Sequence, residues 1–200
     1  MLHNSKQKHA DHEELGAKVY AKFINYRSGE ILLFAPAMGN LEIPAFDGII
    51  FDITKMAIAN FSLKTIYSKM PLEAAVRAIN ATKAYSEKRN WLRAHGFIQP
   101  ANGPVMEGWN KDMLRSRQFD ELFGWVQEAT HLFGISSLEY RPARIVLHFA
   151  ESKFHPEEGL VLALQSLIRE AGKTGDSVTL LDDAKALVVS GHEAQLFNLE

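Results

Sequence analysis

The 200-residue sequence contains no cysteine. This absence excludes disulfide bonds, thiolate metal sites and cysteine nucleophiles. The sequence also lacks any run of about 18 apolar residues, so we expect no membrane-spanning segment. Its opening segment, MLHNSKQKHADHEE, has no apolar central stretch and does not resemble a secretory signal. Internal repeats, a G-x-S-x-G elbow and an H-E-x-x-H helix are absent as well.

The sequence has no large excess of either charge, because 22 basic and 24 acidic residues give a net charge of −2. The segments differ, however. Residues 64–117 carry 10 basic and 4 acidic side chains, and residues 118–200 carry 6 basic and 13 acidic ones. Either the folded chain intermixes these charges, or the central basic block contacts an acidic partner locally. The total excludes a uniformly basic nucleic-acid binder.

Apolar periodicity and turn residues divide the chain into helices and strands. We expect a disordered polar tail over residues 1–10, followed by a helix over 12–26 with Asp11 as its N-cap. The stretch 96–108 is rich in Gly, Pro and Asn, which is typical of a loop. The remaining segments are expected as strands at 30–35, 46–53, 56–66, 144–150, 177–181, 186–190 and 195–199, and as helices at 72–93, 112–133 and 157–171.

The strongest chemical signal lies in IPAFDGIIF (43–51) and the following NFSLKT (60–65). If these strands form a hairpin, Asp47 and Lys64 project from one edge of the sheet. Ser62 shares the face of Lys64, because it lies two residues before it. Glu14, near the start of the first helix, can lean over the same edge. Carboxylates bind a hard divalent cation and a lysine neutralises charge on a phosphate, so this pattern indicates phosphodiester hydrolysis.

These residues resemble the PD-(D/E)XK nuclease superfamily, in which a helix bearing Glu precedes a hairpin carrying Asp and Lys. The wording PAFDG followed by FSLKT is most similar to nuclease domains of bacterial polymorphic and contact-dependent inhibition toxins. The resemblance covers residues 11–90. It implies an α/β fold with a mixed sheet and a restriction-endonuclease-like α-β-β-β-α core over 11–95. Residues 96–200 are then a helical or α+β C-terminal elaboration packed on that core.

The resemblance also implies roles for single residues. Asp47 matches the metal-binding aspartate and Lys64 the catalytic lysine. Glu14 matches the helix glutamate, a second metal ligand, with Glu13 as its rival. The implied cofactor is Mg²⁺ or Mn²⁺.

Ser62 departs from the family pattern, because most members have Glu or Gln at this position. Its hydroxyl is expected to hold a water or a phosphate within the catalytic group. Asp52 is an alternative acid, although strict alternation along the strand sends it to the opposite face from Asp47.

A basic helix follows the candidate lysine along the chain. Its cations can hold nucleic-acid phosphates, and Tyr85 and Trp91 can stack on bases. The alternative is a solvated helix face with a buried Trp. The predicted nucleic-acid-binding residues are Lys69, Arg77, Lys83, Lys88 and Arg89, with Arg93 continuing the series.

The sequence thus predicts a metal-dependent nuclease that cleaves DNA or tRNA. By the resemblance, it is a bacterial toxin effector with a cognate immunity protein, and it works in the cytoplasm of the producing cell or of a target cell. One alternative is a catalytically degenerate nuclease fold that binds nucleic acid or protein. Another is an unrelated α/β interaction protein whose acidic C-terminal part is the working surface.

Overall fold

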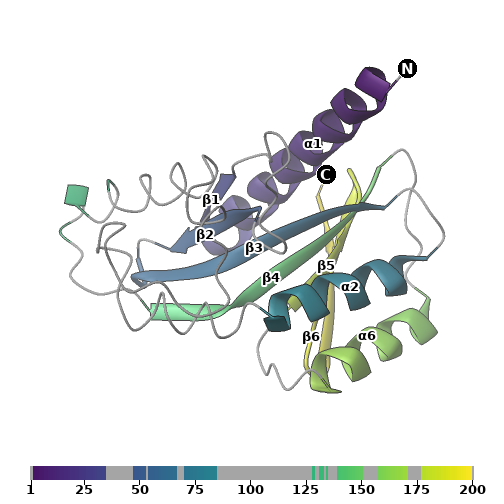
Figure 1. Ribbon diagram of the computed structural model, residues 1–200. Coiled ribbons are helices and arrows are strands. Elements are labelled where there is room, and N and C mark those ends of the chain that lie inside the picture. The colour runs from purple at the N-terminus through teal and green to yellow at the C-terminus, as the bar shows by residue number, and fades with distance from the viewer. Residues whose placement is uncertain are drawn as a thin grey trace.

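The structure is a computed structural model, and the thin grey trace in Figure 1 marks the residues that it does not describe. The described residues are 2–34, 47–52, 54–66, 70–84, 128, 131–132, 134, 139–150, 157–170 and 177–199. None of the helices within these residues is long and apolar enough to cross a membrane.

The described elements are three helices and seven strands. The helices are α1 (Leu2–Ser28), α2 (Pro71–Ala84) and α6 (Glu158–Glu170). The strands are β1 (Ile31–Phe34), β2 (Gly48–Asp52), β3 (Ala57–Ile66), β4 (Glu139–Phe149), β5 (Ser177–Leu181), β6 (Lys185–Ser190) and β7 (Glu193–Asn198).

The seven described strands form one sheet in which spatial order follows sequence order, from β1 at one edge to β7 at the other. Strands β1, β2 and β3 are antiparallel neighbours, as are β5, β6 and β7. Strands β3, β4 and β5 are parallel. Parallel neighbours need a crossover connection, and α2 and α6 lie within the two crossovers. The predicted α/β fold with a mixed sheet is therefore confirmed.

Helices cover both faces of the sheet, with α1 on one side and α2 and α6 on the other (Figure 1). Strand β3 shows how the sequence decides this. Its residues Phe61 and Leu63 pack with Tyr20 and Phe23 of α1. Ile66, an odd number of residues away, packs with the alanines of α2. The side chains of β3 thus alternate between the two cores, as the period of two requires.

Helix α1 differs from its predicted bounds at one end. It begins at Leu2, so residues 2–10 are helical and the prediction of a disordered tail is wrong. The physical reason is that neither Gly nor Pro interrupts the chain before Gly16, and Asp11 is accommodated inside the helix. The other end is where the sequence places it. Gly29 follows Ser28 with φ of 71°, the left-handed conformation that ends many helices.

The strands lie within a few residues of their predicted ranges, and β4 is extended at its start to Glu139. Helix α2 is described to Ala84, and the rest of its predicted range lies outside the described residues. The same holds for the predicted loop 96–108 and for most of the predicted helix 112–133. Strands β4 to β7 continue the sheet that β1 to β3 begin, so the C-terminal half shares the core of the N-terminal half.

Candidate active site

The β2–β3 hairpin fixes the position of Asp47. Its backbone N–H donates to the carbonyl of Phe61 at 2.9 Å, just beyond the last ladder pair, Gly48 with Phe61. The side chain turns back onto β3, where Oδ2 accepts the backbone N–H of Leu63 at 2.7 Å. The hydroxyl of Ser62 donates to the same oxygen at 3.3 Å. The carboxylate thereby extends the hairpin ladder by one side-chain link.

Lys64 lies on the same face of β3 as Ser62, because the two are separated by one residue. Asp47 faces Ser62 across the hairpin, so Lys64 is its diagonal neighbour. Diagonal neighbours on one face are about 7–8 Å apart at Cα, within reach of a lysine side chain. Ser62 is buried, whereas Asp47 and Lys64 are half-buried. The structure therefore brings Asp47, Ser62 and Lys64 together.

This face of the hairpin is the side covered by α2. Ile66, on the same face as Lys64, packs with Ala74 and Ala75 of α2. Arg77 lies on the exposed side of that helix, and the backbone of Lys83 lies in its last turn. The remaining predicted nucleic-acid contacts and stacking rings lie outside the described residues, namely Lys69, Lys88, Arg89, Arg93, Tyr85 and Trp91.

Glu14 lies on the other side of the sheet. It belongs to α1, which packs on the face of Phe61 and Leu63, and Ser62 and Lys64 point away from that face. Its carboxylate Oε1 is 2.7 Å from Nζ of Lys18, an ion pair on the helix surface. Glu13 belongs to the same helix. The expectation that Glu14 leans over the edge beside Asp47 is corrected, because alternation along β3 separates the two.

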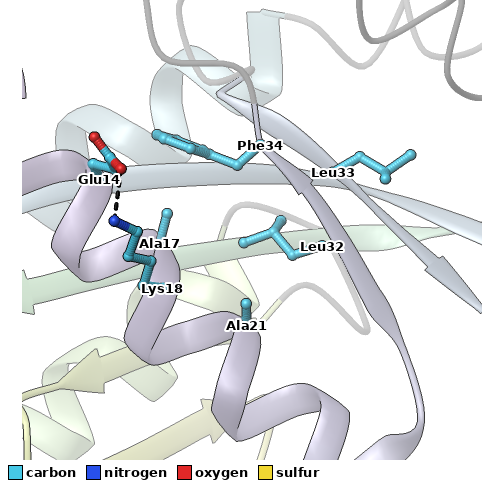
Figure 2. Close-up of a pocket in the computed structure, with 7 residues that line it drawn as sticks. All are labelled: Glu14, Ala17, Lys18, Ala21, Leu32, Leu33 and Phe34. Atoms are coloured by element: carbon cyan, nitrogen blue, oxygen red, sulfur yellow. Dashed lines mark ion pairs between the residues drawn. The ribbon is translucent and has the colours of Figure 1, made fainter.

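Glu14 lines a groove of about 700 Å³ between α1 and the edge strand β1. In Figure 2 Leu32 and Phe34 point toward α1, while Leu33 points away from it. The Glu14–Lys18 ion pair runs along the α1 side of this otherwise apolar groove (Figure 2). The groove therefore lies on the α1 face and is separate from the Asp47 side of the hairpin.

The donor set for a divalent cation is small in the part of the chain that the structure describes. No group of three His, Asp or Glu side chains that could hold a metal occurs there. Among the described residues, Asp47 supplies a carboxylate to the candidate site, and Ser62 adds a hydroxyl. Oxygen donors of this kind suit Mg²⁺ or Mn²⁺. The predicted acidic pair is divided between the two faces, with Asp47 on the Ser62 face and Glu14 on α1 over the Phe61 face.

Asp52 ends β2 on the α1 face, so it does not replace the missing acid beside Lys64. It accepts hydrogen bonds from the hydroxyl of Thr54 at 2.7 Å and the N–H of Lys55 at 3.0 Å. Its carboxylate is 3.4 Å from the guanidinium of Arg141. Burial raises the pKa of Asp52, but these hydrogen bonds and the nearby cations outweigh it and hold the pKa below 3.8. Asp52 anchors the hairpin turn.

Arg141 also connects Asp52 to a second buried acid, Glu30, which follows α1. Arg141 and Arg144 each approach Glu30 at 3.7 Å. Tyr20 lies beside this network, and burial raises its pKa to about 12. The positive charges of Arg141 and Arg144 thus face the negative charges of the buried Glu30 and Asp52. These ion pairs connect the end of α1 with β2 and β4. Sequence reasoning did not identify this network, because only the strand register brings Glu30 and Arg141 together.

His148 lies near the carboxyl end of β4, buried against α1. Its Nδ1 has no hydrogen-bond partner, and neither has the hydroxyl of Thr65, its register partner on β3. Burial lowers the pKa of His148, Asp183 and Asp182 oppose that shift, and His12 adds to it. His148 is therefore a buried residue of the core whose surroundings favour the neutral ring.

Three of the four predicted catalytic residues, Asp47, Ser62 and Lys64, thus lie on the hairpin face that α2 covers, and Glu14 does not. Comparison with known proteins gives no relative: no protein family, no curated protein and no solved structure matches this chain significantly.

Proposed function

We propose that the protein is a metal-dependent nuclease of the PD-(D/E)XK type that cleaves phosphodiester bonds of DNA or tRNA. The observation that carries the proposal is the placement of Asp47, Ser62 and Lys64 on one face of a hairpin, with Asp47 bonded to the backbone beside Lys64 at 2.7 Å. The α-β-β-β-α order from α1 to α2 supports it, since the sequence resemblance implies that order.

Each residue has a chemical task in this proposal. The ammonium of Lys64 orients the attacking water or offsets negative charge that develops on the phosphate. The Ser62 hydroxyl, with lone pairs beyond its bond to Asp47, holds a water or a phosphate oxygen. Asp47 provides the carboxylate that would hold Mg²⁺ or Mn²⁺. Such an ion, when bound, polarises the phosphoryl oxygen and lowers the pKa of a bound water.

Substitutions that preserve the hairpin test the proposal most sharply. Asp47→Asn keeps an oxygen that accepts the Leu63 N–H while removing the negative charge, and Lys64→Met keeps the length of the side chain. We expect each to lower the cleavage of plasmid DNA or bulk tRNA by at least about a hundredfold, the usual size of an electrostatic contribution to catalysis. Cleavage is measured with Mg²⁺, with Mn²⁺ and with a chelator.

Two variants serve as matched controls. Glu14→Gln removes a carboxylate on the opposite face, and Lys185→Ala removes an exposed lysine of β6. Both should cleave like the wild type. Loss of cleavage in Glu14→Gln with Asp47→Asn fully active would contradict the assignment of the site.

One observation favours a second function. Both the Leu63 N–H and the Ser62 hydroxyl bind Oδ2 of Asp47, and no second acid lies at position 62. A site with a hydroxyl in place of a second acid suits a degenerate nuclease fold that binds nucleic acid or protein. Retained binding of DNA or tRNA by the wild type, without cleavage under any divalent cation, would identify this case.

The biological setting rests on the resemblance to toxin domains. We propose that the protein acts in the cytoplasm of a competing bacterial cell and that an immunity protein neutralises it. Expression in a bacterial host should then stop growth, Asp47→Asn should relieve the arrest, and so should co-expression of a cognate inhibitor. Equal growth arrest by wild type and Asp47→Asn would separate toxicity from the proposed chemistry.

A further inference from the structure

Strand β7 forms the second edge of the sheet, opposite β1. Five of its six residues are exposed, and Leu196 has 52% of its surface accessible to solvent. No strand in the described part of the chain pairs with its outer side. The strand contains neither Lys nor Pro, the residues with which proteins commonly protect an edge. Its outer side is therefore open to another strand.

The hydrogen bonds to β6 decide which residues of β7 face outward. The N–H of Leu199 donates to the carbonyl of Ala184 at 2.8 Å, so Leu199 faces β6. In an antiparallel ladder this direction alternates, and the backbones of Ala194, Leu196 and Asn198 therefore face outward. The carbonyl of Asn198 accepts a hydrogen bond from Arg27 at 3.2 Å. Ala194 and Leu196 are left to pair with an added strand.

We propose that a second copy of this chain adds its β7 to this edge, antiparallel, about a twofold axis at Gln195. In this register Ala194 faces the partner's Leu196, and Leu196 faces the partner's Ala194. These outward pairs exchange four backbone hydrogen bonds, two for each pair. The exposed Leu196 side chain packs against an alanine methyl group, and no like charges oppose each other. The two sheets become one continuous sheet.

Charge complementarity selects the second copy as the occupant. In the same register Phe197 is the direct neighbour of the partner's Glu193, and both side chains lie on the α1 face. The guanidinium of Arg27 lies over the Phe197 ring, 5.2 Å from its centroid. The partner's Glu193 thus meets Arg27 at a depression of about 400 Å³. The charged residues that line it are two cations, Lys22 and Arg27, and one acid, Asp183, so its charge favours an incoming carboxylate. The twofold axis makes this contact twice.

The chain is free of cysteine, so a single introduced cysteine tests the register directly. Gln195 meets the partner's Gln195 as a non-hydrogen-bonded pair, with Cα atoms about 4.5 Å apart, a separation that permits a disulfide. Under mild oxidation we expect Gln195→Cys to form disulfide-linked dimers rapidly. Leu162→Cys, an exposed position on α6, is the control. Equal rates for both variants would overturn the proposal, and faster linkage of Leu196→Cys would overturn this register.

Mass measurements test the interface without cross-linking. Light scattering of the full chain should give twice the 22.5 kDa mass of one chain. Leu196→Lys should shift it to monomer, because a lysine protects an edge strand and does not disturb the bonds to β6. Glu193→Lys should weaken the dimer about tenfold, and the added substitution Arg27→Glu should restore it. A monomeric wild type would overturn the proposal. This holds also if the edge binds a different protein, because the chain alone would then be a monomer.

Discussion

The surroundings of Gly16 leave no room for a side chain larger than hydrogen. Gly16 lies in α1 directly over the ring of the buried His148. A Cβ at this position would lie 2.8 Å from Nδ1 and 2.9 Å from Cγ of that ring. The close approach of α1 to β4 therefore depends on this glycine, although glycine is intrinsically unfavourable inside a helix.

Gly16→Ala should consequently destabilise the protein, despite the better helix propensity of alanine. We expect a loss of about 1–3 kcal/mol in the free energy of unfolding, since overpacking a core has this cost. Urea denaturation followed by circular dichroism measures it. The matched control is Gly159→Ala in α6, where an added Cβ meets no atom within 4 Å. A destabilisation of the same size at both positions would contradict the steric argument.

The burial of neutral His148 has a consequence for the pH dependence of stability. Its pKa in the folded protein lies below the unfolded value of 6.5, chiefly because burial disfavours the charged ring. The unfolded chain therefore binds more protons as the pH falls through 6.5, and the folded state is increasingly destabilised down to the folded pKa. The slope from this one group is at most about 1.4 kcal/mol per pH unit.

His148→Leu removes this titration, so its stability should fall less than that of the wild type between pH 7 and lower pH. The chain has eight histidines, and the matched control is His192→Gln, a substitution at an exposed histidine. Denaturation midpoints at a series of pH values give both slopes. Parallel curves for wild type and His148→Leu would show that His148 is not buried in its neutral form.

At the scale of elements, the sequence predicted most of the sheet because each strand carries its own signal. The apolar run from Glu30 to Ala35 predicts the strand that the structure contains as β1. Thr54 and Lys55 lie in the turn between β2 and β3. The sequence analysis missed the start of α1, because a polar segment without Gly or Pro is compatible both with a helix and with a disordered tail. Local patterns do not separate these two states, since a polar stretch without periodic apolar residues gives no helical signal.

The candidate site was predictable only in its hairpin part. Asp47, Ser62 and Lys64 are placed by alternation and by the turn between two strands, and both are local properties. Glu14 depended on which face α1 covers, a tertiary property decided by the packing of Tyr20 on Phe61, whose rings lie 5.2 Å apart. Glu30 and Arg141 lie more than a hundred residues apart, and they meet only through the pairing of β1 to β4, including the parallel register of β3 and β4. No local sequence pattern specifies such a contact.

At the scale of the whole molecule, the two proposed working surfaces are far apart. The candidate site lies on β3 and the proposed dimer edge is β7, with four strand spacings between them. At about 4.8 Å for each spacing, the separation is about 19 Å. A twofold axis through the edge of the sheet keeps the α2 sides of both copies on the same side. Each copy then presents a complete hairpin site, and neither site borrows a residue from the partner.

Cleavage and dimerisation should therefore be separable by substitution. Leu196→Lys should abolish the dimer and leave the cleavage rate per chain within about twofold of the wild type, because separated sites act additively. Asp47→Asn should abolish cleavage and leave the mass in solution at that of the dimer. Measuring both properties in both variants gives four results, of which two should change. Loss of cleavage in a folded, monomeric Leu196→Lys variant would mean that the site needs the second copy, and the hairpin could then not be the complete catalytic unit.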